Sequence, residues 1–241
     1  AEPINVRAIR LNPEHWSADD WHIVGKVEDA WKACEDCLEK LRFNDYAHVL
    51  YEFFWHEFCD WYVEYAKDVL YNADETRRVE VLKVMHYVFD RALRLLHPLM
   101  PFLTEELWHG MGYGLDEEYI AFAVWPDASQ SQLRNLAQPY MDYVDAKHEI
   151  IGLGRKLRAD FEIAPAQKVD IAIKPHNDAE ADALRADARA IAMMLKAQNL
   201  TIDPAFAPAQ AMPSSLGKLG TIYMGLGADV DAKAEIAKMQ K

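Results

Sequence analysis

The stretch from Arg42 to Tyr71 constrains the fold most, because it has the pattern of one long helix crowded with aromatic side chains. Apolar residues recur along it at steps of three and four, which is the spacing of the buried faces of an α-helix. These residues are Tyr46, Leu50, Phe53, Phe54, Phe58, Trp61, Tyr62, Tyr65 and Val69. We expect only a narrow polar strip, made of Glu52, His56, Asp60 and Glu64, to face water. The pattern predicts a helix buried nearly all round at the centre of a bundle.

Three residues precede this helix and are the first candidates for a binding role. Asn44 is predicted to be the N-cap, so that the helix begins near Asp45. Arg42, Phe43 and Asn44 would then lie at a helix N-terminus, where free N–H groups and the helix dipole favour phosphate. The ring of Phe43 is suited to stack on an unpaired base. The alternative is that Phe43 is a hydrophobic staple packed on the helix beneath it.

Further helices are predicted on both sides of the central one. Ser17, with Asp20 three residues later, has the pattern of a capping box and opens a helix that runs to about Leu41. Asp74 is expected to cap another helix, which runs from Glu75 to Leu96 and is followed by Pro98 and Pro101. Thr104 is predicted to cap a short helix that ends in a glycine-rich segment, and residues 119–125 beyond it are expected to be extended. The CxxC pair Cys34 and Cys37 lies within the first of these helices and is interpreted as core packing, because no second ligand pair stands at zinc spacing.

The second half begins with one more helix, whose first turn is predicted at Pro139 and whose end is predicted near Phe161. Lys147, Arg155 and Arg158 fall on one side of it at about 100° per residue. They are the second group of candidate phosphate contacts, and the alternative is that they form only a solvated rim. No metal ligands and no catalytic residues are predicted anywhere in the chain.

Beyond Pro165 the periodicity changes to that of strands. Residues 169–173 alternate with period two, and 200–202 and 221–226 are further strand candidates. An alanine-rich helix is expected over 179–198, a loop over 204–218, and a helix beginning at about Val230. The predicted fold class is therefore mainly α: a helical bundle followed by a small α/β domain.

Charge and hydropathy limit the possible partners. The net charge of −13 argues, by itself, against nucleic acid, because affinity for phosphate depends on Lys and Arg. Acidic residues dominate in 1–76, whereas basic residues outnumber acidic ones in 147–174, so a polyanion would have to approach a local patch. The sequence has no run of about 18 apolar residues and no secretion signal. We expect a soluble, cytoplasmic protein that binds neither DNA nor membranes.

Three motifs stand out in the first half of the chain: the Arg42-Phe43 step, the run Phe58-Cys59-Asp60-Trp61-Tyr62, and the segment from His97 to Trp108. Together they resemble the C-terminal part of valyl-tRNA synthetases. The likeness continues through Leu157-Arg158-Ala159 and Ile163-Ala164-Pro165 into the first strand, and it is weakest over residues 176–218. The resemblance covers roughly residues 19–241.

This resemblance implies an anticodon-binding bundle of the class I synthetase type and assigns domain limits. They are a lead-in over 1–16, the bundle over 17–126, a small α/β domain over 127–228, and the root of a C-terminal coiled-coil arm over 229–241. The implied partners are tRNA, specifically tRNA(Val), and a catalytic domain of the same polypeptide. The His-Ile-Gly-His and Lys-Met-Ser-Lys-Ser motifs of such a catalytic domain are absent from the sequence. We therefore expect no cofactor in this portion, with ATP and Mg²⁺ used by the catalytic domain.

Two alternatives stay open at this stage. The same region of an isoleucyl or leucyl synthetase would have a similar architecture, although the Phe-Cys-Asp-Trp-Tyr run favours the valine enzyme. A helical protein-interaction module with no RNA role would fit the acidic balance.

Overall fold

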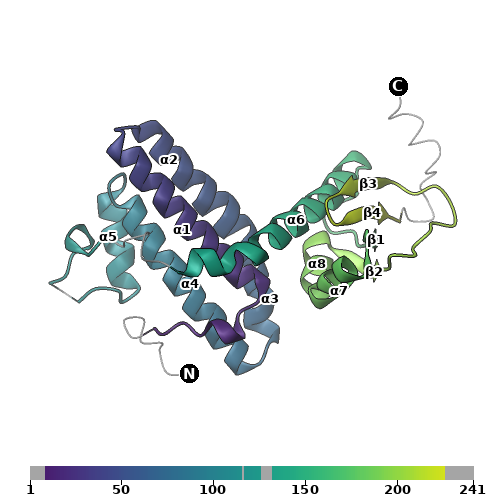
Figure 1. The fold of residues 1–241 in the computed structure, drawn as a ribbon, viewed down its shortest axis with the longest axis horizontal. Helices are drawn as coiled ribbons and strands as arrows, with labels where there is room; N and C mark the ends of the chain where they lie inside the picture. The colour runs from purple at the N-terminus through teal and green to yellow at the C-terminus, as the bar shows by residue number, and fades with distance from the viewer. Residues whose placement is uncertain (1–8, 116, 126–131, 226–241) are drawn as a thin grey trace. The chain divides into compact units, whose positions relative to one another are not determined.

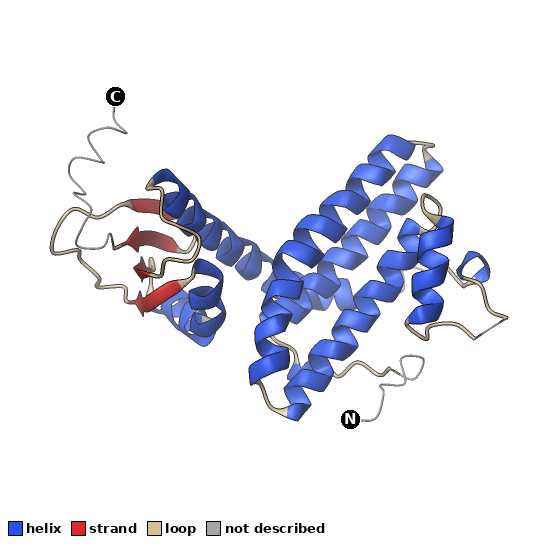
Figure 2. Cartoon of the chain, turned by 180° about the vertical axis from the view of Figure 1, so that it is seen from behind, coloured by secondary structure: helices blue, strands red, loops and turns tan. Residues whose placement is uncertain are grey.

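A computed structural model describes residues 9–115, 117–125 and 132–225 (Figure 1). Its contacts divide the chain into two compact units, residues 1–142 and 143–241. The first unit is a helical bundle and the second is a small sheet with helices, which confirms the predicted fold class (Figure 2). The division falls inside helix α6 (Leu133–Asp160), and the boundary expected near residue 126 stays a prediction. No helix among the described residues is long and apolar enough to cross a membrane.

The bundle is built from helices that run up and down in chain order. They are α1 (Ala18–Glu39), α2 (Phe43–Tyr51), η3 (Glu52–Val63), α3 (Glu64–Asn72), α4 (Glu75–Leu96) and α5 (Pro101–Gly110). Ser17 and Asp20 form the predicted capping box at the start of α1. Asp74 caps α4 by accepting a hydrogen bond from the backbone N–H of Arg77. These local signals placed both helices correctly.

Helices α2, η3 and α3 form one continuous rod from Phe43 to Asn72, as predicted, but the rod differs from the prediction in two ways. Its middle part, η3, is a π-helix, a rare geometry that carries i→i+5 hydrogen bonds. The rod is also not buried nearly all round: Phe43, His48, Tyr51 and Trp55 are exposed. That part of the prediction is wrong because helical spacing shows that residues share a face and does not show what covers the face.

Two predicted helix starts are also wrong. Helix α2 begins at Phe43, so Asn44 lies inside its first turn, and the N-cap position belongs to Arg42, whose carbonyl accepts from the N–H of Tyr46. Helix α5 begins at Pro101, where a missing N–H has no cost. Thr104 is buried inside that helix, and its hydroxyl bonds to the carbonyl of Met100 and to Nδ1 of His97. Asn44 and Thr104 are both suitable N-cap residues, but each helix begins before the residue that was predicted to cap it.

The first part of α6 packs on α1, and this contact explains the glycine in the middle of α1. A Cβ atom added to Gly25 would lie 2.4 Å from Sδ of Met141 and 3.1 Å from Cβ of Ala137. Helix α6 starts at Leu133, earlier than predicted, and Pro139 lies in its interior rather than in its first turn. Nearby, the ring of Tyr140 stacks on Trp21 with centroids 5.5 Å apart.

The segment before α6 contains no strand within its described residues, although 119–125 was expected to be extended. Residues Ile120–Phe122 form a short 3₁₀ turn, η4, in which Ile120 is buried. The N–H of Ile120 donates to the carboxylate of Glu105 on α5, which holds this turn against the bundle. Near the N-terminus another 3₁₀ turn, η2 (Pro13–His15), is the only regular element in the described part of the lead-in.

The second unit is a four-stranded mixed sheet in the order β2-β1-β4-β3. Its strands are β1 (Val169–Lys174), β2 (Ala197–Ile202), β3 (Ser214–Gly217) and β4 (Gly220–Met224). Strand β1 pairs with β2 in parallel and with β4 antiparallel. The three predicted strands are present, whereas β3 lies inside the segment predicted to be a loop. Its four residues have too little alternation to signal a strand.

The alanine-rich segment forms two helices, α7 (Asp178–Ala186) and α8 (Ala188–Leu195), rather than one. The break is at Asp187, whose carboxylate accepts hydrogen bonds from Tyr143 and Lys147 of α6, each at 2.8 Å. Helix α6 approaches α8 and the sheet closely at Gly154, where a Cβ would lie 2.4 Å from Leu195 and 2.8 Å from Ile222. The coiled-coil root predicted over 229–241 lies outside the described residues.

Candidate nucleic-acid interface

The turn between α1 and α2 places Arg42 at the surface. Leu41 adopts a left-handed backbone conformation (φ 55°), and the N–H of Arg42 donates to the carbonyl of Cys37, so the chain reverses within a few residues. The guanidinium of Arg42 then contacts the carboxylates of Asp36 at 2.5 Å and Asp45 at 3.1 Å. Lys40 contacts the other oxygen of Asp36, also at 2.5 Å. Both cations of this turn are therefore exposed and paired with carboxylates.

Phe43 is the first residue of α2, and its side chain faces water. It is 56% exposed, which contradicts the alternative of a buried staple. Asn44 follows in the first helical turn and is exposed as well. The N–H groups of a first helical turn have no intrahelical acceptor, so the surface around Phe43 offers backbone donors next to an uncovered aromatic ring.

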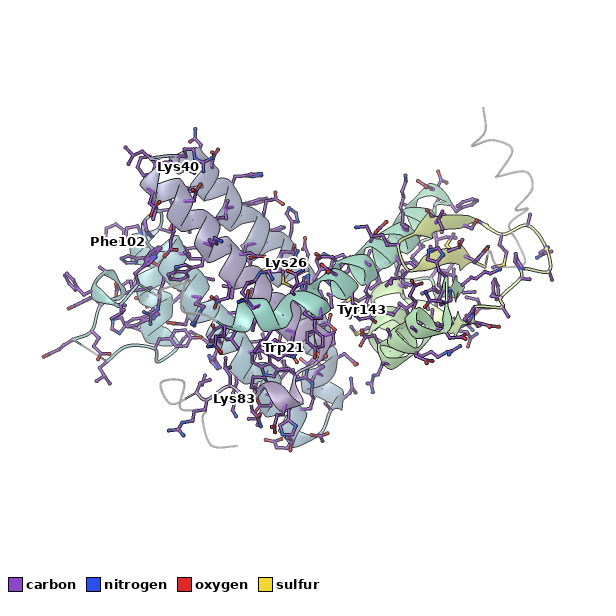
Figure 3. All side chains as sticks on the ribbon, viewed as in Figure 1. Trp21, Lys26, Lys40, Lys83, Phe102 and Tyr143 are labelled. Carbon is purple, nitrogen blue, oxygen red and sulfur yellow. The ribbon has the colours of Figure 1, made fainter. Side chains whose placement is uncertain are left out.

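The turn between α4 and α5 lies at the same end of the bundle. Leu95 near the end of α4 packs in one cluster with Cys37 and Tyr46, and the hydroxyl of Tyr46 donates to the carbonyl of Leu95 at 2.5 Å. Beyond it Phe102 is 90% exposed, and Leu99, Met100 and Leu103 are exposed beside it in the chain. Lys40 and Phe102, labelled in Figure 3, mark the two turns. We call this end, residues 40–43 and 98–103, the bundle tip.

Sequence reasoning missed Phe102 as a candidate. The residue stands in a motif that carried the family resemblance, but nothing in the pattern distinguishes an exposed phenylalanine from a core one. Its position directly after Pro101, at the start of a helix whose N–H groups are free, was the available signal.

The predicted basic edge on α6 is not a surface feature. Lys147 is only 2% exposed, and its ammonium is 2.8 Å from the carboxylate of Asp187. Arg158 is 8% exposed and donates to the carbonyls of Ala164 and Gln167, which follow the end of α6. The prediction of one exposed basic edge is wrong because both long side chains turn into the core of the second unit. Of the three residues only Arg155 is exposed.

The buried thiols have no features of reactive groups. Burial raises the pKa of Cys34 to about 12, so the thiolate, which is the reactive form, is scarce at neutral pH. Burial also raises the pKa of Cys59. His56 and Asp60 form an exposed pair, 3.0 Å apart, one turn from each other on the rod. The burial of Cys34 and Cys37 in one core cluster and the raised pKa of the Cys34 thiol support the interpretation of this pair as packing residues.

The sequence of the helical bundle matches a known protein family. Residues 20–173 match the family described as the anticodon-binding domain of tRNA ligase. The match covers well over half of the chain and includes the rod and both turns of the bundle tip. The chain belongs to this family.

The chain is similar to several curated valine--tRNA ligases. The valine--tRNA ligase of Listeria innocua is 29% identical over 93% of this chain, and that of Chromobacterium violaceum is 33% identical over 95%. The valine--tRNA ligase of Aquifex aeolicus is 34% identical over 70% of the chain. The matched region is 25%, 23% and 15% of these three relatives, in that order. The chain thus spans a quarter or less of the length of the relatives it matches.

Proposed function

We propose that this chain binds the anticodon end of a tRNA, specifically tRNA(Val), and positions the tRNA for aminoacylation by a catalytic domain of the same polypeptide. The observation that carries the proposal is the exposed ring of Phe43 at the start of α2, in a bundle of the anticodon-binding family. Anticodon bases are single-stranded, so they can splay out and stack on aromatic side chains. The names of the relatives support valine over isoleucine or leucine.

The proposed contacts are Phe43 for stacking, with Arg42 and Asn44 beside it, and Arg155 as a separate phosphate contact in the second unit. Lys147 and Arg158 are left out because their charged groups are buried against acceptors of the same unit. We assign no catalytic step and no cofactor to this chain, and ATP and Mg²⁺ would be used by the catalytic domain. The proposed compartment is the cytoplasm, and neither DNA nor a membrane is a proposed partner.

The test is tRNA binding by Phe43→Ala. Stacking is worth about 1 to 3 kcal/mol per base by alanine substitution, so we expect affinity for tRNA(Val) to fall by about tenfold or more. Because the ring is more than half exposed, the melting temperature should change little. Tyr71→Ala is the matched control, since Tyr71 is an exposed aromatic residue at the last turn of α3.

Arg42→Ala is the companion variant. It should weaken binding without lowering stability, but by less than Phe43→Ala does, because Asp36 and Asp45 already pair with the guanidinium. An unchanged affinity in Phe43→Ala, measured by filter binding at several salt concentrations, would contradict the assignment of Phe43. If the wild-type chain binds no tRNA at all, the protein-interaction alternative takes precedence.

A further inference from the structure

A second surface of the bundle has the features of a pocket for a nucleobase. A cavity of about 510 Å³ lies between α4, α5 and the segment 117–124. Its volume is within the range of small-ligand sites, about 300 to 1,000 Å³. The residues that line it include Arg94, Trp108, Glu117, Tyr119 and Phe122. We call it the Glu117 cavity.

The aromatic walls of the Glu117 cavity are open to solvent. Phe122 is 86% exposed and Tyr119 is also exposed, although both stand in a short segment that is fixed to the bundle through Ile120. Their ring centroids are 6.5 Å apart and the rings are inclined by 82°. Two perpendicular rings form a corner, so a planar base that stacks on one ring meets the other at its edge. Trp108 is buried and closes the floor of the cavity.

The charged groups of the cavity favour the edge of a base over a phosphate. Arg94 is the one cation among its lining residues, and Nε of Arg94 contacts Asp90 while Nη1 donates to the carbonyl of Val124. Glu118 accepts a hydrogen bond from the N–H of Leu115. Glu117 is exposed, and among the described residues its carboxylate accepts no hydrogen bond. Among the described lining residues, the charged group that remains without a partner is thus the Glu117 carboxylate, which repels phosphate and accepts N–H donors.

A carboxylate next to stacking rings selects among the four bases. Guanine has two adjacent donors, N1–H and N2–H, on its Watson–Crick edge and can present both to one carboxylate. Adenine and cytosine place one amino donor beside a ring-nitrogen acceptor, and uracil places one donor between two carbonyl acceptors, so each brings a lone pair toward the negative oxygens. Hydrogen bonds that involve a charged acceptor are the stronger ones, which makes the difference measurable.

We propose that the Glu117 cavity binds an unpaired guanine base of single-stranded RNA, with Phe122 stacking on the base, Tyr119 meeting its edge, and Glu117 accepting from N1–H and N2–H. The proposal rests on the proposed function for the nature of the partner, an RNA. It concerns a different surface from the bundle tip, because none of the lining residues belongs to residues 40–43 or 98–103.

The experiment measures binding of labelled heptaribonucleotides by fluorescence anisotropy. One probe is all uridine, and the others carry a single central guanosine, adenosine or cytidine. We expect the guanosine probe to bind the wild-type chain about tenfold more tightly than the other three. Glu117→Gln should remove this preference, whereas Glu106→Gln, the same substitution at an exposed glutamate of α5, should keep it. Phe122→Ala should weaken all four probes by about tenfold, and Tyr71→Ala should not.

The outcomes separate this proposal from the tRNA proposal. Equal affinity for all four probes, no measurable binding of any probe, or a guanosine preference that survives Glu117→Gln would overturn the guanine site. Loss of tRNA binding in Phe43→Ala, together with unchanged probe binding by the cavity variants, would leave the tRNA proposal standing alone. A guanosine preference in a chain that binds no tRNA would support the guanine site and contradict the tRNA proposal. Glu117 and Phe122 are both exposed, and a circular-dichroism melt verifies that each variant is folded.

Discussion

The ion pair between Lys147 and Asp187 leads to a prediction that distinguishes a structural lysine from an RNA-binding one. Removing one partner of a buried pair costs about 3 to 5 kcal/mol, because a buried charge remains without its counterpart. In Lys147→Met the remaining Asp187 keeps the hydroxyl of Tyr143 at 2.8 Å, and its side chain is 18% exposed. We therefore expect a smaller loss than this range, about 2 kcal/mol.

The reciprocal variant should cost more. Asp187→Asn keeps an acceptor for Tyr143 but removes the negative charge next to an ammonium whose side chain is only 3% exposed. We expect a loss of about 3 to 4 kcal/mol, within the range for breaking a buried pair. The double variant Lys147→Met with Asp187→Asn should lose less than the sum of the two single losses, because residues in direct contact are coupled.

Urea unfolding followed by two signals is the appropriate assay. All seven tryptophans lie between Trp16 and Trp125, so their fluorescence reports the first unit, whereas far-ultraviolet circular dichroism reports both. We expect the ellipticity midpoint to fall in the single variants and the fluorescence midpoint to move less. The salt dependence of tRNA binding should stay unchanged. A stable Lys147→Met variant whose salt slope falls by about 1 would refute the reasoning and restore Lys147 as a phosphate contact.

Two further predictions concern the bundle. Gly25→Ala gains about 1 kcal/mol of helix propensity but places a methyl group against Met141 and Ala137, and overpacking costs about 1 to 3 kcal/mol. We expect a net lower melting temperature, and a smaller loss when the substitution is made in a Met141→Ala background; equal losses in the two backgrounds would contradict the steric explanation. Burial lowers the pKa of His86, so the unfolded state binds a proton at a higher pH than the folded state does, and stability should decrease as the pH falls below about 6.5. In His86→Gln the unfolding free energy measured between pH 7.5 and 5 should decrease less, and an identical pH profile would show that other groups are responsible.

The parts of the fold that sequence predicted well are those set by local chemistry. The capping box at Ser17 and the cap at Asp74 each satisfy N–H groups within three residues, so the sequence alone locates them. Strand β1 alternates strongly and was found for the same reason. The start of α5 was misplaced because Pro101 and Thr104 both suit a helix start, and the hydroxyl of Thr104 bonds to His97 and to the carbonyl of Met100 instead of capping the helix.

The candidate site was harder to predict because exposure is a property of the whole fold. Phe43 and Phe58 look alike in sequence, yet one faces water and the other is buried. Lys147 lies on the same side of α6 as Arg155, but the break at Asp187, which splits the alanine-rich helix, supplies a carboxylate that draws Lys147 inward. No periodicity in α6 contains that information, since the partner stands forty residues further along the chain.

The carboxylate of Asp36 has a consequence for selectivity at the bundle tip. It already occupies the positions around Lys40 and Arg42 that a phosphate would take. Under the proposed function, an incoming strand gains little from charge alone, because each new phosphate contact there must displace an existing partner. Long polyanions of arbitrary sequence are therefore poor competitors at this surface, and only a strand that also offers a base to Phe43 has a net advantage. Because Asp36 competes with phosphate for Lys40 and Arg42, this acidic chain can discriminate among RNAs by whether they offer a base for stacking, without hydrogen bonds to a base edge.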